Sequence, residues 1–454
     1  MNSNAMIQDI VTKARNAQRE FESYNQQQVD AVVRAIAKVV YDRAEELARM
    51  AVEETRMGVL EDKIKKNLGK SRIIWHNLKD KKSVGLINYN EQTGVAEVAR
   101  PMGVVGAVTP CTNPIVTPMC NAMFALKGRN AIIIAPHPRA RQCAVFLTGL
   151  FNQAIRSLGA PENLIQVIAE PTNELTADLM KAVDVIVATG GMGMVKAAYS
   201  SGKPAYGVGA GNVQCIIDRD VDFTETAPKI IAGRIFDNGI ICSGEQSIIV
   251  HADDYDAVIR AMAASGGGLV SDPAEKERLR RALFVHGAMN KDLVGQSVGQ
   301  VAATAGIELP AGTRAILVEA DGIGDADALC REKMCPVIAT FKYRSFAEAV
   351  AIAKANLAVE GKGHSISIHS HNRENITYAA EQVPVCRVLI NQICSTMNGG
   401  SFYNGFAPTT TLGCGSWGNN SISENLDYKH LINITRIGYC QKDAVVPTDA
   451  EIWG

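Results

Sequence analysis

The spacing of apolar residues along the chain changes near residue 84. Before that point apolar side chains recur every three or four residues with charges between them, as in VDAVVRAIAKVVYDRAEELARMAVEET (29–55). This spacing predicts helices across residues 6–80. Residues 84–100, VGLINYNEQTGVAEVAR, alternate apolar and polar positions on either side of a Gln-Thr-Gly turn. Alternation around a turn predicts a β-hairpin.

Beyond residue 100, short runs rich in Ile and Val alternate with helix-like segments. The first runs are AIIIA (131–135), LIQVIA (164–169) and VDVIVAT (183–189), with a helix expected to begin near Arg139. A second series of strands is expected within residues 247–266, 313–320, 336–357, 364–370 and 386–392. Strands alternating with helices predict parallel sheets covered on both faces. We therefore expect two α/β domains with a boundary near Asp218.

Composition narrows the functional classes. The chain has 454 residues, of which 47% are hydrophobic and 20% charged, as in ordinary globular proteins. Its formal net charge of -1 gives no basis for binding nucleic acid or an anionic membrane. No apolar run is long enough to span a bilayer, and the opening MNSNAMIQDI lacks the basic and apolar segments of a secretory signal. We therefore expect a cytoplasmic protein.

Cys242 is the first candidate for chemistry. Eleven cysteines are scattered singly, without a C-x-x-C pair, which argues against a zinc knuckle or a redox dithiol. Each is therefore first interpreted as a small apolar core residue, kept reduced in the cytoplasm. Cys242, in FDNGIICSGEQS (236–247), differs because it follows an Asn-Gly turn and stands beside Ser-Gly. Without further information, its thiol is either structural or a nucleophile.

Two glycine clusters offer room for a ligand. Gly190-Gly191-Met192-Gly193 follows a predicted strand and precedes a helix, whose free N–H groups suit a phosphate. Lys196 stands where the last glycine of a complete G-x-G-x-x-G would fall, so a plain tight turn is the alternative. GVGAGN (207–212) could let the backbone approach a ligand closely.

A proline-rich segment and a histidine-rich segment complete the candidates. TPCTNPIVTP (109–118) carries three prolines around Asn113. A stiff segment can hold a side-chain amide for a developing oxyanion, although a plain turn is the simpler interpretation. HSISIHSH (364–371) does not predict a metal site, because strand alternation turns His364 away from the other two histidines and no carboxylate or cysteine stands at ligand spacing. A single working histidine at His364 remains open.

These motifs occur together, and in the same order, in one family. The chain resembles the aldehyde dehydrogenase superfamily, in particular its coenzyme A-acylating branch, over nearly all residues from Met6 to Gly454. The stretches that carry the resemblance are VTPMCNAM, IIIAPHPRA, KAAYSSGKPAYGVGAGN, NGIICSGEQS, EKMCPV, TTTLGCGSWGNNSISENL and HLIN. The resemblance implies an α/β fold of two domains with Rossmann-like parallel sheets and a small oligomerisation hairpin. The implied parts are N-terminal helices with an NAD(P)-binding domain (1–218), a catalytic domain (219–405) and a loop-rich return segment (406–454).

The resemblance also implies roles for individual residues. Cys242 would be the nucleophile, and Asn113, with the backbone N–H of Cys242, would bind the oxyanion. His364 would lie near the thiol and the incoming coenzyme A, and Glu332 would hold the nicotinamide ribose. The other cofactor-binding positions that it implies are Thr109, Pro110, His137, Arg139, Arg141, Gly190, Gly191 and Gly209.

Two departures from the hydrolytic aldehyde dehydrogenases bear on the reaction. Those enzymes carry a water-activating glutamate where this chain has Gly207-Val208-Gly209-Ala210. Because a coenzyme A thiol ionises near neutral pH and needs less help than water, the missing base favours acyl transfer to coenzyme A. Many NAD-preferring members also carry a glutamate after strand 131–135, where this chain has Arg139 and Arg141. Guanidinium groups pair with phosphate, so we expect NADP(H) to be accepted beside NAD(H); two solvated arginines are the alternative.

Within the branch, the chain most resembles enzymes that reversibly reduce succinyl-CoA to succinate semialdehyde through a cysteine thioester. A succinyl carboxylate needs cationic or hydroxyl partners, and the candidates are Ser243, Thr409, Thr410 and Thr411. An acetyl, propionyl or butyryl group would need an apolar pocket instead. A hydrolytic enzyme and an inactive scaffold are further alternatives. The resemblance also implies a homodimer or homotetramer, small-molecule substrates and no metal.

Overall fold

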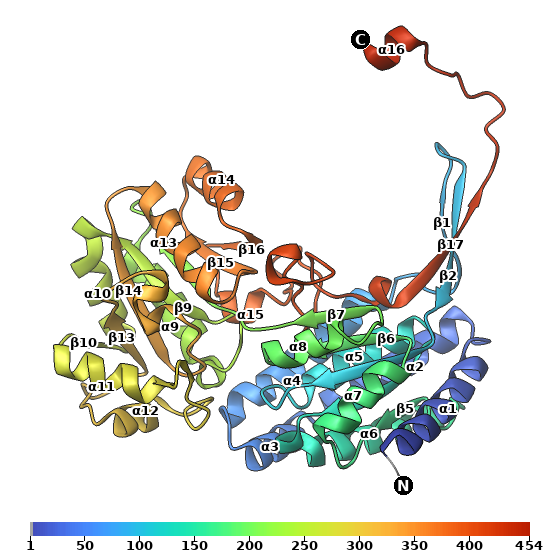
Figure 1. Cartoon of the computed structure of the whole chain (residues 1–454), viewed down its shortest axis with the longest axis horizontal. Coiled ribbons are helices and arrows are strands. Elements are labelled where there is room, and N and C mark those ends of the chain that lie inside the picture. Colours follow the sequence, from blue (N-terminus) through green and yellow to red (C-terminus); the bar gives the residue numbers. More distant parts are fainter. Residues whose placement is uncertain (1–2) are drawn as a thin grey trace.

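The computed structural model describes residues 3–454 as two α/β lobes with an antiparallel arm that projects from one of them (Figure 1). Four helices open the chain: α1 (Ser3–Phe21), α2 (Gln26–Asp42), α3 (Ala44–Thr55) and α4 (Leu60–Leu78). Their apolar residues fall at three- and four-residue spacing and turn inward; in α2, Val29, Val33, Ile36 and Val40 are fully buried. The helical region predicted over residues 6–80 is therefore confirmed.

The first lobe is built on a five-stranded parallel sheet in the order β5-β4-β3-β6-β7. Its strands are β3 (Val104–Thr109), β4 (Ala131–Pro136), β5 (Ile165–Val167), β6 (Val185–Thr189) and β7 (Ala205–Val208). Every residue of β3 and β4 is buried, which explains their continuous apolar runs. The helices of this lobe are α5 (Val116–Lys127), α6 (Arg141–Arg156), α7 (Asn173–Ala182) and α8 (Met192–Tyr199).

The strand order of the first sheet reverses between β3 and β6. The chain builds outward from β3 through β4 to β5, then returns to the other side of β3 and continues through β6 to β7. In open α/β sheets, ligands bind outside the carboxyl ends of the strands at such a reversal. Thr109 and Pro136 are paired at this end of β3 and β4, and Gly190 directly follows β6.

The second lobe is a seven-stranded parallel sheet in the order β10-β13-β14-β9-β8-β15-β16. Its strands are β8 (Val213–Ile217), β9 (Glu245–His251), β10 (Gly267–Val270), β13 (Ala315–Glu319), β14 (Val337–Tyr343), β15 (Gly363–His369) and β16 (Val385–Ile390). Its helices are α9 (Phe223–Ile235), α10 (Tyr255–Ala264), α11 (Pro273–Leu283), α12 (Val298–Ala305), α13 (Phe346–Val359), α14 (Arg373–Gln382) and α15 (Cys394–Met397). A two-stranded hairpin, β11 (Phe284–Val285) and β12 (Ala288–Met289), is attached to it.

The chain passes from one sheet to the other between Val208 and Val213, a few residues before the predicted boundary at Asp218. Strand β8 pairs in parallel with β9 and β15 and so belongs to the second sheet, although residues 213–217 were assigned to the first domain. All five residues of β8 are buried. Apolar character predicts that a strand is buried but does not tell which sheet buries it, which explains the difference.

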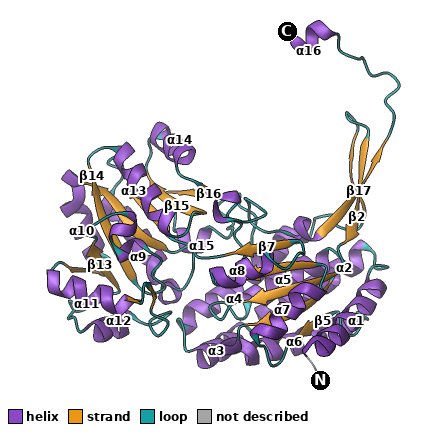
Figure 2. Ribbon diagram, in the orientation of Figure 1, coloured by secondary structure: helices purple, strands orange, loops and turns teal. Residues whose placement is uncertain are grey.

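The projecting arm is an antiparallel sheet of three strands (Figure 2). The predicted hairpin forms β1 (Gly85–Asn90) and β2 (Val95–Pro101), and β17 (Ile432–Gly438), near the end of the chain, pairs with β2. Beyond β17 the chain extends away from both lobes to α16 (Asp449–Trp453). No helix within residues 3–454 is long and apolar enough to cross a membrane.

Candidate active site

Cys242 lies in the turn that connects α9 to β9 of the second sheet. The preceding Asp237 and Asn238 both have left-handed backbones, with φ of 52° and 53°. This conformation is uncommon for residues with side chains and indicates a backbone path imposed by its surroundings. The chain therefore turns sharply just before the thiol, which is partly exposed and faces a cavity.

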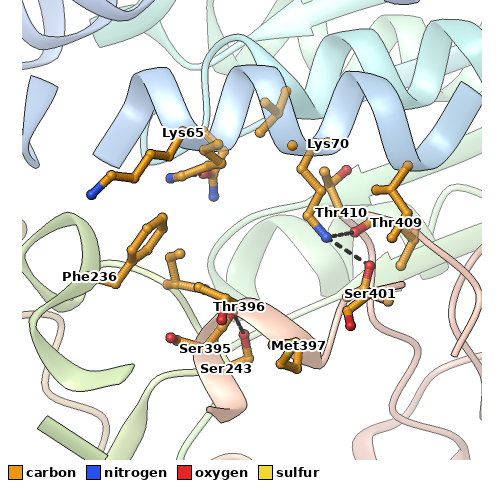
Figure 3. A pocket seen from close by; sticks show the side chains of 18 of the residues that line it. Lys65, Lys70, Phe236, Ser243, Ser395, Thr396, Met397, Ser401, Thr409 and Thr410 are labelled. Carbon is orange, nitrogen blue, oxygen red and sulfur yellow. Dashed lines mark hydrogen bonds between the residues drawn. The ribbon is translucent and has the colours of Figure 1, made fainter. Parts of the chain in front are cut away.

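The cavity has a volume of about 490 Å³ and lies between α4 and the loops that follow β16 (Figure 3). Lys65 and Lys70 reach it from α4, while Ser243, Ser395 and Met397 lie on the opposite side. No Asp or Glu of the described chain lines the walls, although Asp62 pairs with Lys65 and Asp237 pairs with Lys66 from behind them. Their cationic side chains are Lys65, Lys66, Lys70 and Arg72. A small anionic molecule would therefore be favoured here.

Two hydroxyls on the walls have no partner. The Oγ of Ser395 and the Oγ1 of Thr410 are buried, and neither forms a hydrogen bond within residues 3–454. Buried polar groups are normally paired, so these hydroxyls remain available to a ligand. Lys70, close to Thr410 in Figure 3, donates from Nζ to the carbonyl oxygens of Gly399 (2.7 Å) and Thr409 (3.1 Å).

Three of the four hydroxyl residues predicted for the substrate line this cavity. Ser243, Thr409 and Thr410 are on its walls, and Ser243 donates from Oγ to the Ser395 carbonyl at 3.0 Å. Thr411 is fully buried and does not line the cavity; its Oγ1 lies 3.3 Å from the Oγ1 of Thr189. Its hydroxyl is thus engaged with the first lobe.

Asn113 reaches the same cavity from the turn between β3 and α5. Its Oδ1 accepts a hydrogen bond from Nζ of Lys66 at 2.7 Å. The fold therefore brings two of the three residues predicted for catalysis, Asn113 and Cys242, to one cavity, although they come from different lobes. An amide N–H and a thiol that line one cavity would suit the oxyanion of an acyl-transfer intermediate.

The Cys242 thiol rests protonated. Burial raises its pKa to about 12, the carboxylate of Glu332 and the thiol of Cys414 add to this shift, and the Arg387 guanidinium opposes it. Arg387 is itself buried and donates to the carbonyl oxygen of His364 at 2.9 Å. Its fixed positive charge is the group that favours the thiolate.

Glu332 is linked to Cys242 through Gly211. Its Oε1 accepts from the Gly211 backbone N–H at 3.2 Å, and Gly211 lies directly against Cys242. Burial, with the neighbouring Glu360 carboxylate, raises the pKa of Glu332 to about 8. A carboxyl group this close to the thiol fits the ribose-binding role predicted for it, which stays a prediction.

His364 is fully buried at the start of β15 and does not line the cavity. Its Nδ1 lies 3.0 Å from the Oγ of Ser365, while its Nε2 has no partner within residues 3–454. Burial, with the nearby Arg387 cation, lowers the pKa of the imidazole to about 3. His364 is therefore neutral at physiological pH, and its role toward coenzyme A stays a prediction.

The glycine turn at Gly190 and Gly191 opens the eight-residue helix α8. No side chain caps this helix, and a Cβ atom at Gly190 or Gly191 would meet nothing closer than 3.9 Å. Free N–H groups and open space at a helix N-terminus fit a pyrophosphate. Between α7 and α8 lies a slot of about 330 Å³ whose apolar lining includes Ala177, Met180 and Met194. A flat aromatic ring such as adenine fits such a slot.

The other predicted cofactor residues surround the carboxyl end of the first sheet. Thr109 ends β3, and Pro110 follows it. His137 follows β4 and accepts from the Arg139 backbone N–H at 3.1 Å. The two arginines are engaged: Arg139 donates to the Thr55 carbonyl at 3.1 Å, and Arg141 forms an ion pair with Glu170. Gly209 faces Met192, whose sulfur would lie 2.2 Å from an added Cβ atom.

Comparison with known protein families decides the class. The model of the aldehyde dehydrogenase family matches residues 1–430. The chain belongs to the aldehyde dehydrogenase family. Its sequence is 53% identical to succinate-semialdehyde dehydrogenase (acetylating) of Clostridium kluyveri, over the full length of both chains.

Solved structures of aldehyde dehydrogenases share the fold. An acetylating aldehyde dehydrogenase from Geobacillus thermoglucosidasius superposes with a TM-score of 0.94 at 35% identity, covering 98% of each chain. A propionaldehyde dehydrogenase from Rhodopseudomonas palustris, solved with bound CoA and an acylated cysteine, superposes with a TM-score of 0.84 at 28% identity, covering 95% of this chain and 97% of that one. The predicted fold class is therefore confirmed.

Sequence reasoning missed the lysines of this aldehyde dehydrogenase site. Lys63, Lys66 and Lys70 are spaced three and four residues apart and share one face of α4. That spacing was a visible signal, but only the fold turns this face toward Cys242. Within residues 3–454, no group of three or more His, Cys, Asp or Glu side chains could hold a metal ion. The expectation that the enzyme needs no metal stays a prediction.

Proposed function

We propose that this aldehyde dehydrogenase is coenzyme A-acylating and reversibly reduces succinyl-CoA to succinate semialdehyde and coenzyme A. The observation that carries the proposal is the cavity at Cys242, which is lined by four cationic side chains and by no carboxylate of the described chain. Cations favour an acyl group that carries a carboxylate, and the absence of a carboxylate among the described residues that line the cavity disfavours the activation of water for hydrolysis. The identity of 53% with the Clostridium kluyveri enzyme supports the same reaction.

In the first half-reaction, the Cys242 thiol gives up its proton to solvent, and the resulting thiolate attacks the thioester carbonyl of succinyl-CoA. The carbonyl oxygen becomes an oxyanion, and we assign its stabilisation to the side-chain amide of Asn113 and the backbone N–H of Cys242. Collapse of this intermediate breaks the bond to the sulfur of coenzyme A, which leaves as a thiolate and takes up a proton. Each oxyanion donor is worth about a hundredfold or more in kcat.

In the second half-reaction, the succinyl thioester on Cys242 is reduced. The dihydronicotinamide supplies the hydride when bound, and Glu332 would hold its ribose. Asn113 and the Cys242 N–H again hold the oxygen as negative charge develops on it. Collapse of the thiohemiacetal oxyanion breaks the bond from carbon to Cys242 and releases succinate semialdehyde, and the Cys242 thiolate takes up a proton to return to the resting thiol. His364, which is neutral at physiological pH, is proposed to act on the coenzyme A thiol in the reverse direction, which requires its buried Nε2 to become accessible.

The far carboxylate of the succinyl group is assigned to Lys70 and Thr410. Lys70 uses two of its three N–H groups on backbone carbonyls, so one is left for a substrate oxygen. The unpaired hydroxyl of Thr410 and that of Ser395 supply further donors. Charge-assisted hydrogen bonds of this kind orient the carboxylate of a succinyl group and discriminate against an acetyl group, which has none.

The cofactor is assigned to the first lobe. The uncapped α8, the adjacent slot and Glu332 fit a nicotinamide dinucleotide, and the nucleophile comes from the second lobe. We propose that NADP(H) is accepted, because Arg139 and Arg141 stand at the carboxyl end of β4 where a 2′-phosphate would lie. Glu170 competes for Arg141, so NAD(H) remains a cofactor as well.

A homodimer or homotetramer is the proposed assembly. The arm exposes the edge of β1, and exposed edges pair readily with other chains. The tail beyond it exposes Val445 (90%), Val446 (84%) and Trp453 (81%), which a partner subunit would cover. Removing residues 440–454 should lower the mass measured by sedimentation; an unchanged mass would exclude the tail from the interface. The eleven cysteines are all unpaired, in keeping with a place in the reducing cytoplasm.

The proposed reaction is tested by NADPH and NADH oxidation with succinyl-CoA or acetyl-CoA at equal concentration. Succinyl-CoA should be turned over faster, and Cys242→Ala should abolish turnover, while Cys440→Ala, at an exposed position, should not. Equal turnover of both thioesters would retain the acylating reaction and remove the succinyl assignment. Aldehyde oxidation without coenzyme A would instead show that water reaches the thioester.

A further inference from the structure

The orientation of the Asn113 side-chain amide is set by its hydrogen-bond partner, Lys66. An amide offers an acceptor oxygen on one side and a donor NH₂ on the other, and only the donor side stabilises an oxyanion. Lys66 Nζ lies 2.7 Å from Oδ1 of Asn113. Because an ammonium group can only donate, it binds the oxygen and leaves the NH₂ for another partner. Lys66 therefore determines which end of the amide is free.

Lys66 is in turn fixed by Asp237. Its Nζ lies 2.5 Å from Oδ2 of Asp237, and the two side chains are 9% and 0% exposed. Asp237 also accepts from Lys63 Nζ at 3.0 Å and from the Val59 backbone N–H at 2.9 Å. A buried carboxylate with three donors cannot release one without leaving a buried charge poorly paired, which is costly. The Lys66 ammonium is thus held in one place.

The same network touches the nucleophile's own turn. Asp237 carries a left-handed backbone five residues before Cys242, and its carboxylate ties that turn to α4 through the two lysines. Asn113 comes from the first lobe and Cys242 from the second, so neither sheet alone fixes the distance between them. The ion-paired lysine bridges the two elements that must meet at the oxyanion.

We infer that Lys66, held by Asp237, is a positioning residue that orients the Asn113 amide toward the oxyanion. The inference rests on the proposed acylating reaction. Lys66 acts through Asn113 and serves every acyl group equally, in contrast to Lys70, which is assigned to the succinyl carboxylate. Its loss lets the amide rotate and present its oxygen to the developing charge. Because a missing oxyanion donor lowers kcat by about a hundredfold, a misoriented donor lowers it by roughly ten- to a hundredfold.

The test is a double-mutant cycle of Lys66→Met and Asn113→Ala, with succinyl-CoA and acetyl-CoA as separate substrates. Lys66→Met should lower kcat for both thioesters by the same factor and leave KM nearly unchanged. In the Asn113→Ala background it should have no further effect, since no amide remains to orient. Lys79→Met, at the C-terminal end of the same helix, is the matched control and should retain wild-type kcat.

Three results would overturn the inference. An equal loss in the Asn113→Ala background would mean that Lys66 acts independently of the amide. A loss of kcat with succinyl-CoA alone would mean that Lys66 binds the substrate carboxylate. An unchanged kcat in Lys66→Met would mean that Lys66 has no role in orienting the amide. If Lys66→Met does not fold, Lys66→Gln keeps a partner for Asp237, and its smaller loss should likewise vanish without Asn113. Failure of the proposed function is distinct, because the wild type would then turn over neither thioester.

Discussion

Gly211 lies so close to Cys242 that an added Cβ atom would come within 2.0 Å of the Cys242 carbonyl oxygen. The contact is with backbone, which cannot turn aside as a flexible side chain can. The backbone N–H of Gly211 also donates to Glu332. One glycine therefore lies between the proposed nucleophile, Cys242, and the carboxylate assigned to the cofactor, and any side chain there must displace one of them.

Gly211→Ala should lower kcat roughly a hundredfold, because a shift of about 1 Å in a reacting group costs about that much. Steady-state kinetics with succinyl-CoA, together with a thermal melt, would measure it. Gly149→Ala, on α6 with nothing within 4 Å of an added Cβ atom, is the control and should be neutral or slightly stabilising. An unchanged kcat in folded Gly211→Ala would contradict the close approach.

Gly190→Ala should separate cofactor binding from folding. A Cβ atom at Gly190 has only Met194 within 4 Å, at 3.9 Å, so the thermal melt should be unchanged. The methyl group would project toward the N–H groups of α8 that are assigned to the pyrophosphate, so KM for both NADPH and NADH should rise about tenfold (roughly 1.4 kcal/mol). A normal KM for both cofactors would place the pyrophosphate elsewhere.

Strands such as β4 and β6 were predictable from sequence because they are buried and rich in Ile and Val, whereas β3, β7, β8 and β10 were not predicted. The order in which the strands pair was not predictable, because local periodicity carries no information about which distant segments lie side by side. Thus residues 213–217 were placed in the first domain although β8 pairs within the second sheet, and the pairing of β17 with the hairpin was not expected at all. The same limit applies to the site: resemblance pointed to Cys242 and Asn113, whereas the lysines of α4 become site residues only through the packing of distant segments.

Binding of the succinyl carboxylate by Lys70 should depend on pH. Burial, with the neighbouring Lys66 cation opposing protonation, lowers the pKa of Lys70 to about 8. Only the protonated amine attracts a carboxylate, so KM for succinyl-CoA should rise as the pH increases through about 8, while KM for acetyl-CoA stays level. Lys70→Met should abolish this dependence and raise KM for succinyl-CoA about thirtyfold, which corresponds to roughly 2 kcal/mol for a charge-assisted hydrogen bond.

The comparison with acetyl-CoA controls for ionisations that affect both substrates, such as that of the Cys242 thiol. A parallel rise of KM for the two thioesters would mean that the titrating group is not a carboxylate ligand. Lys70→Arg keeps the cation without a pKa near 8, so its KM for succinyl-CoA should stay level across the same range.

The ion pair between Arg141 and Glu170 should tune the choice of cofactor. Glu170 is 74% and Arg141 44% exposed in their side chains, so the pair itself is worth no more than about 1 kcal/mol. Glu170→Gln frees the guanidinium for a 2′-phosphate and removes a carboxylate that would repel it. KM for NADPH should therefore fall up to about fivefold, with KM for NADH unchanged. Arg141→Ala should shift KM for NADPH the opposite way, and equal changes for both cofactors would mean that neither side chain reaches the 2′ position.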